Sequence, residues 1–148
     1  AGLAVRSYSG ELVDRYERRL MIPICDGAGA PVGFGARTVP GPGWPEQLAK
    51  YLNSAESAVF QKRETLYALH LARRGARKRA EVVVVEGYMD AVALHAAGVD
   101  NAVACLGTAL TEAQLLACGA LLRGSYGAAA LGRAGRVVIN LDADSAGR

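Results

Sequence analysis

The sequence predicts an α/β fold, with a parallel sheet flanked by helices in its second half and a small basic part of mixed α+β structure before it. Short β-branched runs alternate with helical segments only after residue 80. The charge also changes there: residues 1–80 carry 13 Lys and Arg against 7 Asp and Glu, whereas residues 81–148 carry 4 against 7. We therefore expect two domains, residues 1–80 and residues 81–148.

The first half begins with a predicted hairpin. Residues 20–25 and 31–37 have strand composition, and the glycine-rich turn at 26–29 joins them. Residues 38–50 hold several prolines and glycines, which favour a loop. Residues 64–74 have helical composition and lead into a basic cluster that closes this half. That cluster consists of Arg73, Arg74, Arg77, Lys78 and Arg79.

The second half alternates between strands and helices, as parallel sheets do. Gly98 ends the first of these helices, and Thr111 with Gln114 forms a capping box that starts the second. The predicted elements are a strand at 81–86, a helix at 89–97, a strand at 101–105, a helix at 111–123 and a strand at 136–141. Between the last two lies an Ala/Gly-rich insertion at 124–135 without clear periodicity.

Carboxylates follow two of these strands. Glu86 comes directly after four valines, and Asp142 and Asp144 follow the last strand. Because working groups of parallel sheets collect where strands end, these acids are expected to share one sheet edge. Clustered carboxylates suit a hard cation, and we expect Mg²⁺, with Mn²⁺ as an alternative. Such a site indicates phosphoryl transfer. The alternative is that these acids only cap or charge the starts of helices.

Composition excludes several other classes. With 148 residues, 51% of them apolar, the chain can form a packed core. No apolar run approaches the ~18 residues of a membrane span, and no signal segment opens the chain. The three cysteines and two histidines lack zinc-ligand spacing, so we expect reduced cysteines. Because the chain starts at Ala1 without Met and stops at Arg148 in a strand-to-helix turn, we expect it to be part of a longer protein.

Several motifs together resemble a known family. Glu86-Gly87-Tyr88-Met89-Asp90 and Asp142-Ala143-Asp144-Ser145-Ala146-Gly147 are similar to the two signature elements of the Toprim domain. The first half resembles the RNA-polymerase core of bacterial DnaG-type primases. Its matching motifs are Asp14-Arg15-Tyr16, Met21-Ile22-Pro23-Ile24, Gly33-Phe34-Gly35-Ala36-Arg37, Lys50-Tyr51-Leu52-Asn53-Ser54 and Phe60-Gln61-Lys62, and Leu106-Gly107-Thr108 matches in the second half.

The resemblance implies a fold and an activity. The fold would be a Toprim domain after a basic subdomain, and the activity would be the synthesis of short RNA primers on single-stranded DNA during replication. Glu86, Asp142 and Asp144 would hold the catalytic metal, with Asp90 in support. The positions implied for binding nucleotide and template are Arg37, Lys50, Asn53, Lys62, Arg15 and Arg19.

The family also implies partners. These are single-stranded template, ribonucleoside triphosphates and a replicative helicase that binds through a C-terminal domain not contained in this sequence, with no membrane. Zinc would belong to a separate N-terminal module. A further acidic motif would fall beyond Arg148, so we expect little activity from residues 1–148 alone. The implied location is the bacterial cytoplasm, at the nucleoid and replisome, with a plastid stroma as the alternative.

Three other functions stay open at this stage. They are a Toprim nuclease or topoisomerase, a primase-helicase, and an inactive nucleic-acid-binding fragment. Tyr88 is a poor candidate for a strand-cleaving nucleophile, because a covalent tyrosine needs an activating environment. Tyr51 and Phe60 are expected to pack internally. The basic cluster at 73–79 is either a non-specific electrostatic contact with nucleic acid or a solvated surface.

Overall fold

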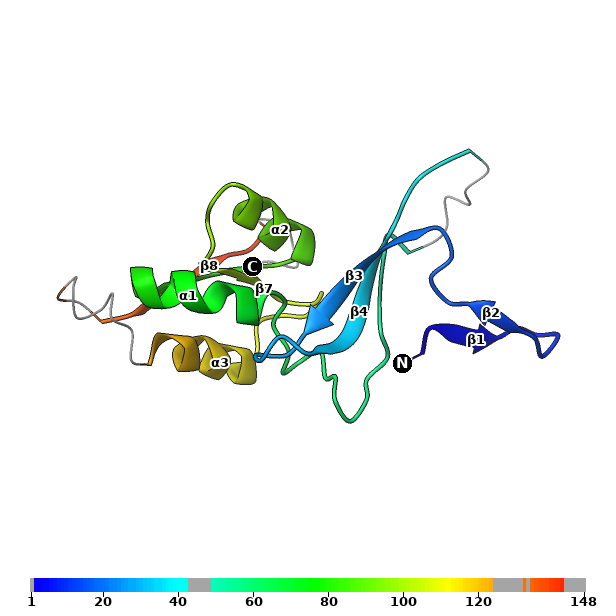
Figure 1. Cartoon of the computed structure of the whole chain (residues 1–148), viewed down its shortest axis with the longest axis horizontal. Helices are drawn as coiled ribbons and strands as arrows, with labels where there is room; N and C mark the ends of the chain where they lie inside the picture. The colour runs from blue at the N-terminus through cyan, green and yellow to red at the C-terminus, as the bar shows by residue number, and fades with distance from the viewer. Residues whose placement is uncertain (1, 43–48, 124–131, 133, 143–148) are drawn as a thin grey trace. The chain divides into compact units, whose positions relative to one another are not determined.

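A computed structural model describes residues 2–42, 49–123, 132 and 134–142 of the chain (Figure 1). The predicted insertion at 124–135 lies largely outside these residues. The chain forms two compact units, which are described separately. The N-unit comprises Ala1–Ile24 and Pro31–Phe60, and the C-unit comprises Cys25–Ala30 and Gln61–Arg148.

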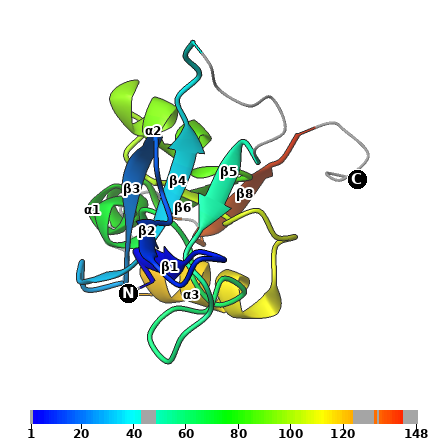
Figure 2. The same ribbon diagram turned by 90° about the vertical axis from the view of Figure 1, so that its right-hand side faces the viewer.

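The N-unit is built from antiparallel strands. Strands β1 (Ala4–Arg6) and β2 (Leu12–Asp14) pair with each other. A second sheet has the order β3-β4-β5, with β4 in the middle (Figure 2). It contains β3 (Arg19–Cys25), β4 (Pro31–Thr38) and β5 (Tyr51–Asn53). The hairpin predicted at 20–37 is therefore confirmed.

The turn between β3 and β4 is held by one side chain. The Asp26 carboxylate accepts hydrogen bonds from the amides of Ala28 at 2.8 Å and Ala30 at 2.9 Å. These bonds are the main cause of a lowered Asp26 pKa, because they favour the charged form. Gly29 adopts φ +94°, a left-handed conformation that suits glycine.

The C-unit contains the predicted parallel sheet, in the order β7-β6-β8. Its strands are β6 (Glu81–Val85), β7 (Ala102–Ala104) and β8 (Arg136–Asn140), and its helices are α1 (Leu69–Arg79), α2 (Tyr88–Ala96) and α3 (Glu112–Leu122). No helix in the described part of the chain has the length and apolar character needed to cross a membrane.

The valines of β6 supply the core on both faces of this sheet. Val82 and Val84 join the larger apolar cluster with residues of α1 and α3, whereas Val85 packs against Ala91 of α2. This alternation follows from the period of two along a strand. Accordingly, α2 covers one face, and α1 and α3 cover the other (Figure 1).

The predicted helix at 64–74 is wrong in position, because α1 spans Leu69–Arg79 and contains the whole basic cluster. The preceding residues are not helical: residues 62–64 form a turn, and the Tyr67 amide donates to the Ala104 carbonyl at 2.9 Å. Ala68 then turns the chain at φ 62°, outside the right-handed helical region. The buried face of α1 comprises Ala72, Gly75 and Ala76, and sequence composition alone did not reveal it.

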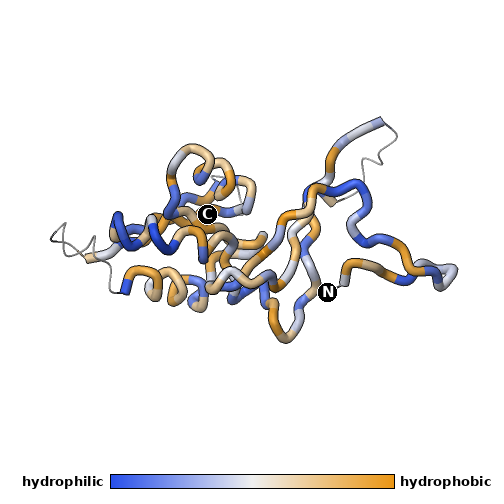
Figure 3. The backbone as a smooth tube through the Cα atoms, viewed as in Figure 1, coloured by the Kyte–Doolittle hydropathy of each residue, from blue (hydrophilic) through white to orange (hydrophobic). Residues whose placement is uncertain are grey.

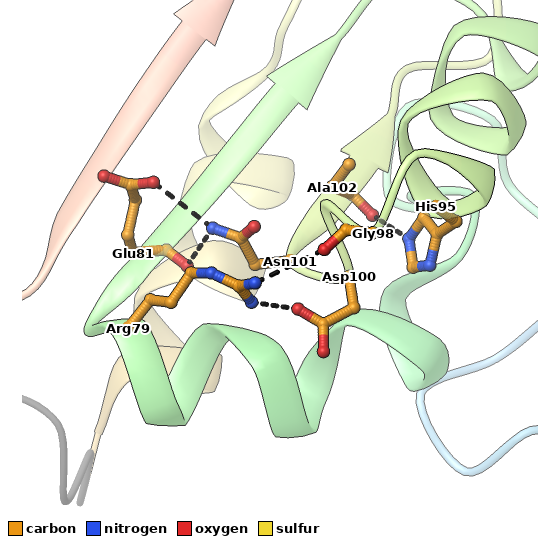
Figure 4. A network of polar contacts seen from close by, with 7 residues as sticks. All are labelled: Arg79, Glu81, His95, Gly98, Asp100, Asn101 and Ala102. Carbon is orange, nitrogen blue, oxygen red and sulfur yellow. Dashed lines mark hydrogen bonds and ion pairs between the residues drawn. The ribbon is translucent and has the colours of Figure 1, made fainter.

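Polar contacts close the edge at which the strands begin (Figure 4). Arg79 forms an ion pair with Asp100, and the buried Asn101 donates to the Glu81 carbonyl at 3.0 Å. The Glu81 carboxylate forms an ion pair with Arg136, at the start of β8. Arg79 and Arg136 are therefore each paired with an acid at this edge.

Close approaches fix the helices to this edge. A Cβ added at Gly75 would meet Asp100, lying only 2.6 Å from its carbonyl oxygen, so glycine lets α1 approach the α2–β7 connection. Gly135, just before β8, lies against Leu122, the last residue of α3. The end of α3 and the start of β8 are therefore adjacent.

Candidate active site

The structure brings Glu86 and Asp142 together at the edge where the strands end. Strands β6 and β8 are parallel and in register, with Val85 opposite Asn140. Glu86 follows the first strand directly, and Asp142 follows the second by two residues. The Asp142 amide donates to Oε2 of Glu86 at 3.3 Å, a contact between residues 56 positions apart in the chain. Asp144 lies outside the described residues.

Glycine shapes the turn that follows Glu86. Gly87 is the N-cap of α2, and its amide donates to the Asp90 carboxylate at 3.1 Å. A Cβ at Gly87 would lie 3.1 Å from the same carboxylate oxygen. Asp90 therefore fixes the turn that directly follows Glu86.

The electrostatic setting distinguishes this edge from the opposite one. Within the described residues, no Lys or Arg lies at ion-pair distance from the carboxylate of Glu86 or Asp142, unlike Glu81 and Asp100. Burial raises the pKa of the Cys105 thiol, and the negative charge of Glu86 raises it further. In the described part of the chain no three potential ligands form a metal cluster. Two carboxylates at one edge still fit a hard cation that keeps several waters.

Strands β4 and β5 carry two of the predicted binding residues, Arg37 and Asn53, and Lys50 directly precedes β5. The register pairs Arg37 with Tyr51 and Gly35 with Asn53. Arg37 and Lys50 place their cationic groups 5.6 Å and 5.7 Å from the centre of the Tyr51 ring. Tyr51 is 41% exposed, so the expectation that it packs internally is wrong.

The alternation along β5 could have located the Tyr51 ring on the surface, but three residues are too few to establish a pattern. Phe60, at 1% exposure, is buried as expected.

The remaining predicted residues divide between the units. Arg19 donates to the Ala49 carbonyl at 3.0 Å, beside Lys50, and the Arg15 guanidinium lies 5.9 Å from the Tyr16 ring centre. Both arginines belong to the N-unit. Lys62 instead belongs to the C-unit, together with Glu86 and Asp142.

Thr108 is a polar residue of the C-unit to which the sequence assigned no role. It lies in the connection after β7, which is next to β6 in the sheet. Its hydroxyl oxygen is buried and has no hydrogen-bond partner among the described residues. The signal available in the sequence was its place in the motif Leu106-Gly107-Thr108, which gives no indication of burial.

A parallel sheet with acids at the ends of neighbouring strands defines the C-unit as a Toprim-type domain, and a family model agrees. The Toprim domain model matches residues 80–148. The model described as DNA primase catalytic core, N-terminal domain, matches residues 1–73. The chain therefore belongs to the bacterial DnaG-type primase catalytic cores, with a Toprim domain as its second half.

Individual relatives agree with this assignment. The DNA primase of Synechococcus elongatus is 45% identical over 148 residues, which cover 99% of this chain and 19% of the relative. The RNA polymerase domain of Mycobacterium tuberculosis primase DnaG superposes with a TM-score of 0.79 at 36% identity, covering 98% of this chain and 44% of that one.

A structure of a DnaG primase catalytic domain bound to single-stranded DNA gives a TM-score of 0.75 at 35% identity, covering 99% of this chain and 40% of that one. The chain spans about a fifth of the length of the curated relatives that it matches, as the 19% coverage of the Synechococcus protein illustrates.

Proposed function

We propose that the chain is part of the catalytic core of a DNA primase, which joins ribonucleotides into short RNA primers on a single-stranded DNA template. The observation that carries this proposal is the meeting of Glu86 and Asp142 on adjacent parallel strands, in a chain that belongs to the primase cores. A primase catalytic domain bound to single-stranded DNA is among its structural neighbours. Residues 1–80 would bind template and nucleotide through the six positions named in the first subsection, and residues 81–148 would carry the metal site.

The metal would be Mg²⁺, held by Glu86, Asp142 and Asp144. Carboxylate oxygens are the ligands this cation prefers, and the first two carry no ion pair with the described residues. When bound, the cation would neutralise phosphate charge and make the attacking hydroxyl more acidic. The Asp142 amide donates a hydrogen bond to the Glu86 carboxylate, which supports the proposal that both acids act at the same end of the sheet.

In the reaction, the 3′-hydroxyl of the growing RNA attacks the α-phosphate of a ribonucleoside triphosphate, and pyrophosphate leaves. Arg37, Lys50, Asn53 and Lys62 would hold the triphosphate by charge-assisted and polar hydrogen bonds. Arg15 and Arg19 would guide the template strand. No covalent bond between protein and substrate is needed.

The wider context of this activity follows the family. A replicative helicase would bind through a C-terminal domain, and a separate N-terminal module would carry zinc. The place of action would be the bacterial cytoplasm, at the replisome.

Primer synthesis tests the proposal directly. The intact protein that carries this chain is incubated with single-stranded template, Mg²⁺ and labelled ribonucleoside triphosphates. Glu86→Gln and Asp142→Asn should each abolish labelled primer, whereas Glu112→Gln, an exposed carboxylate at the start of α3, should retain it. Full activity of the first two variants, or nicking of DNA without ribonucleotides, would overturn the proposal.

A further inference from the structure

The C-terminal part of α1 carries a concentrated positive charge that the proposed chemistry does not use. The helix contains five cations and no acidic residue, and its stretch is hydrophilic in Figure 3. Outside this helix, the sequence of the C-unit has six Lys and Arg against nine Asp and Glu. The positive charge of the C-unit is therefore concentrated on this one helix.

The cations of this cluster differ in their contacts. Arg79 forms an ion pair with Asp100, and Arg73 donates to the Gly27 carbonyl at 2.6 Å. Arg74 and Lys78 are exposed, and no carboxylate in the described part of the chain pairs with either. They are four residues apart, so they lie on the same side of the helix.

Like charges at this spacing oppose helix formation. Residues 73 and 77 form a second such pair, both arginines. Cations favour the last turn of a helix, but Arg73 and Arg74 lie in its middle, where the helix dipole contributes little. An anionic ligand would relieve this repulsion.

The position of the cluster indicates a polymer ligand. The last turn of α1 leads through Ala80 into the start of β6, whereas Glu86 follows its end. Five strand residues separate the two edges by about 16 Å. A nucleotide held at Glu86 would not reach Lys78, but a longer strand would. The exposed residues of this helix include no aromatic ring for base stacking, which leaves the phosphates as the group to be recognised.

We propose that Arg74 and Lys78 form a second contact for single-stranded DNA on helix α1 of the C-unit, through the phosphate backbone and without base specificity. The inference takes the nature of its ligand from the proposed function. The affinity for single strands falls as salt rises, and each lost phosphate contact makes the plot of log affinity against log salt less steep by about 0.7. Loss of both cations should reduce the steepness of this plot by about 1.4 and weaken binding on the order of tenfold at 0.1 M salt.

The test is equilibrium binding of fluorescent single-stranded DNA to the intact protein, without nucleotides, across a salt series. The Arg74→Gln/Lys78→Gln variant should bind more weakly than the parent, and its affinity should depend less steeply on salt. Arg6→Gln/Arg123→Gln removes the same charge elsewhere and should bind as the parent does. Arg74→Lys/Lys78→Arg keeps both positive charges and should also bind normally. This variant distinguishes the effect of lost charge from the effect of altered folding.

Three results would overturn the inference: unchanged binding by the glutamine pair, an equal loss in the Arg6/Arg123 control, or loss in the charge-preserving pair. An equal effect on duplex DNA would overturn the single-strand assignment. Glu86→Gln serves as the reference for the proposed function, because it should lose primer synthesis and keep this binding. Failure of one proposal is therefore distinguishable from failure of the other.

Discussion

The buried side chain of Gln114 donates a hydrogen bond to the main-chain carbonyl of Lys62 at 3.1 Å and thereby fixes the backbone of a residue proposed to bind nucleotide. The same amide nitrogen donates to the Thr65 carbonyl at 3.0 Å, and the amide oxygen accepts from the Thr111 amide at 3.1 Å. One residue of α3 therefore holds the 62–65 segment and completes its own helix cap.

Gln114→Leu should lower the free energy of unfolding by about 2–3 kcal/mol, because buried carbonyls lose their donor. Denaturant unfolding measures this change. Glu112→Gln, an exposed residue on the same helix, should stay within about 0.5 kcal/mol of the parent. If the Gln114→Leu variant were as stable as the parent, water would have replaced the lost bonds.

Two glycines in helices should respond to alanine in opposite directions. Gly75→Ala should destabilise by about 1–3 kcal/mol, because its Cβ would meet Asp100 and force α1 away. Gly119→Ala in α3 meets nothing within 4 Å and should stabilise by up to about 1 kcal/mol through helix propensity. Thermal unfolding compares them, and a stabilised Gly75→Ala variant would contradict the close packing described here.

The lowered pKa of Asp26 predicts a dependence of stability on pH. A carboxyl whose pKa is lower in the folded state stabilises the fold above its unfolded pKa, near 3.8, and loses that contribution as pH falls through the folded value. Asp26→Asn should therefore be less stable than the parent at pH 7, and the difference should shrink below about pH 4. Urea unfolding at both pH values measures it. A constant difference would mean that the charge of Asp26 is not involved.

The three thiols should differ in reactivity. Burial raises the pKa of Cys118 to about 11 and also raises that of Cys105, so both stay protonated at pH 8. Cys25 is only partly buried. Iodoacetamide should modify Cys25 first in the native protein, and all three after unfolding, as mass spectrometry would record. Rapid native labelling of Cys118 would indicate opening of the core between α1 and α3.

Divalent-ion binding should depend on the two strand-end acids. Titration with Mn²⁺ should give an affinity at least about tenfold weaker for Glu86→Gln or Asp142→Asn than for the parent, because a carboxylate ligand is lost. Glu112→Gln provides the control, and removal of metal with a chelator should abolish primer synthesis. Equal Mn²⁺ affinity in all variants would place the ion elsewhere.

Features with local causes were predictable from the sequence. The capping box of Thr111 and Gln114 starts α3 as expected, and the four valines of β6 form the central strand. The approach of Glu86 to Asp142 also follows from a general rule of parallel sheets, although their role in catalysis remains a prediction.

Other features depend on contacts that the sequence does not display. Strands β1 and β2 are exposed along their whole length, so they lack the apolar alternation that marks a strand. The start of α1 is set by the pairing of Tyr67 with Ala104, a residue 37 positions away. Similarly, the surface position of Tyr51 depends on its pairing with Arg37 in β4.

The contact between Leu122 and Gly135 joins the end of α3 to the start of β8 at the sheet edge remote from Glu86. Because Leu122 and Gly135 lie against each other, neither α3 nor β8 requires a particular length of chain between them. A change in the length of this connection should therefore leave the acidic edge undisturbed. For the same reason, this connection is a suitable place to graft a fluorescent reporter or an affinity tag.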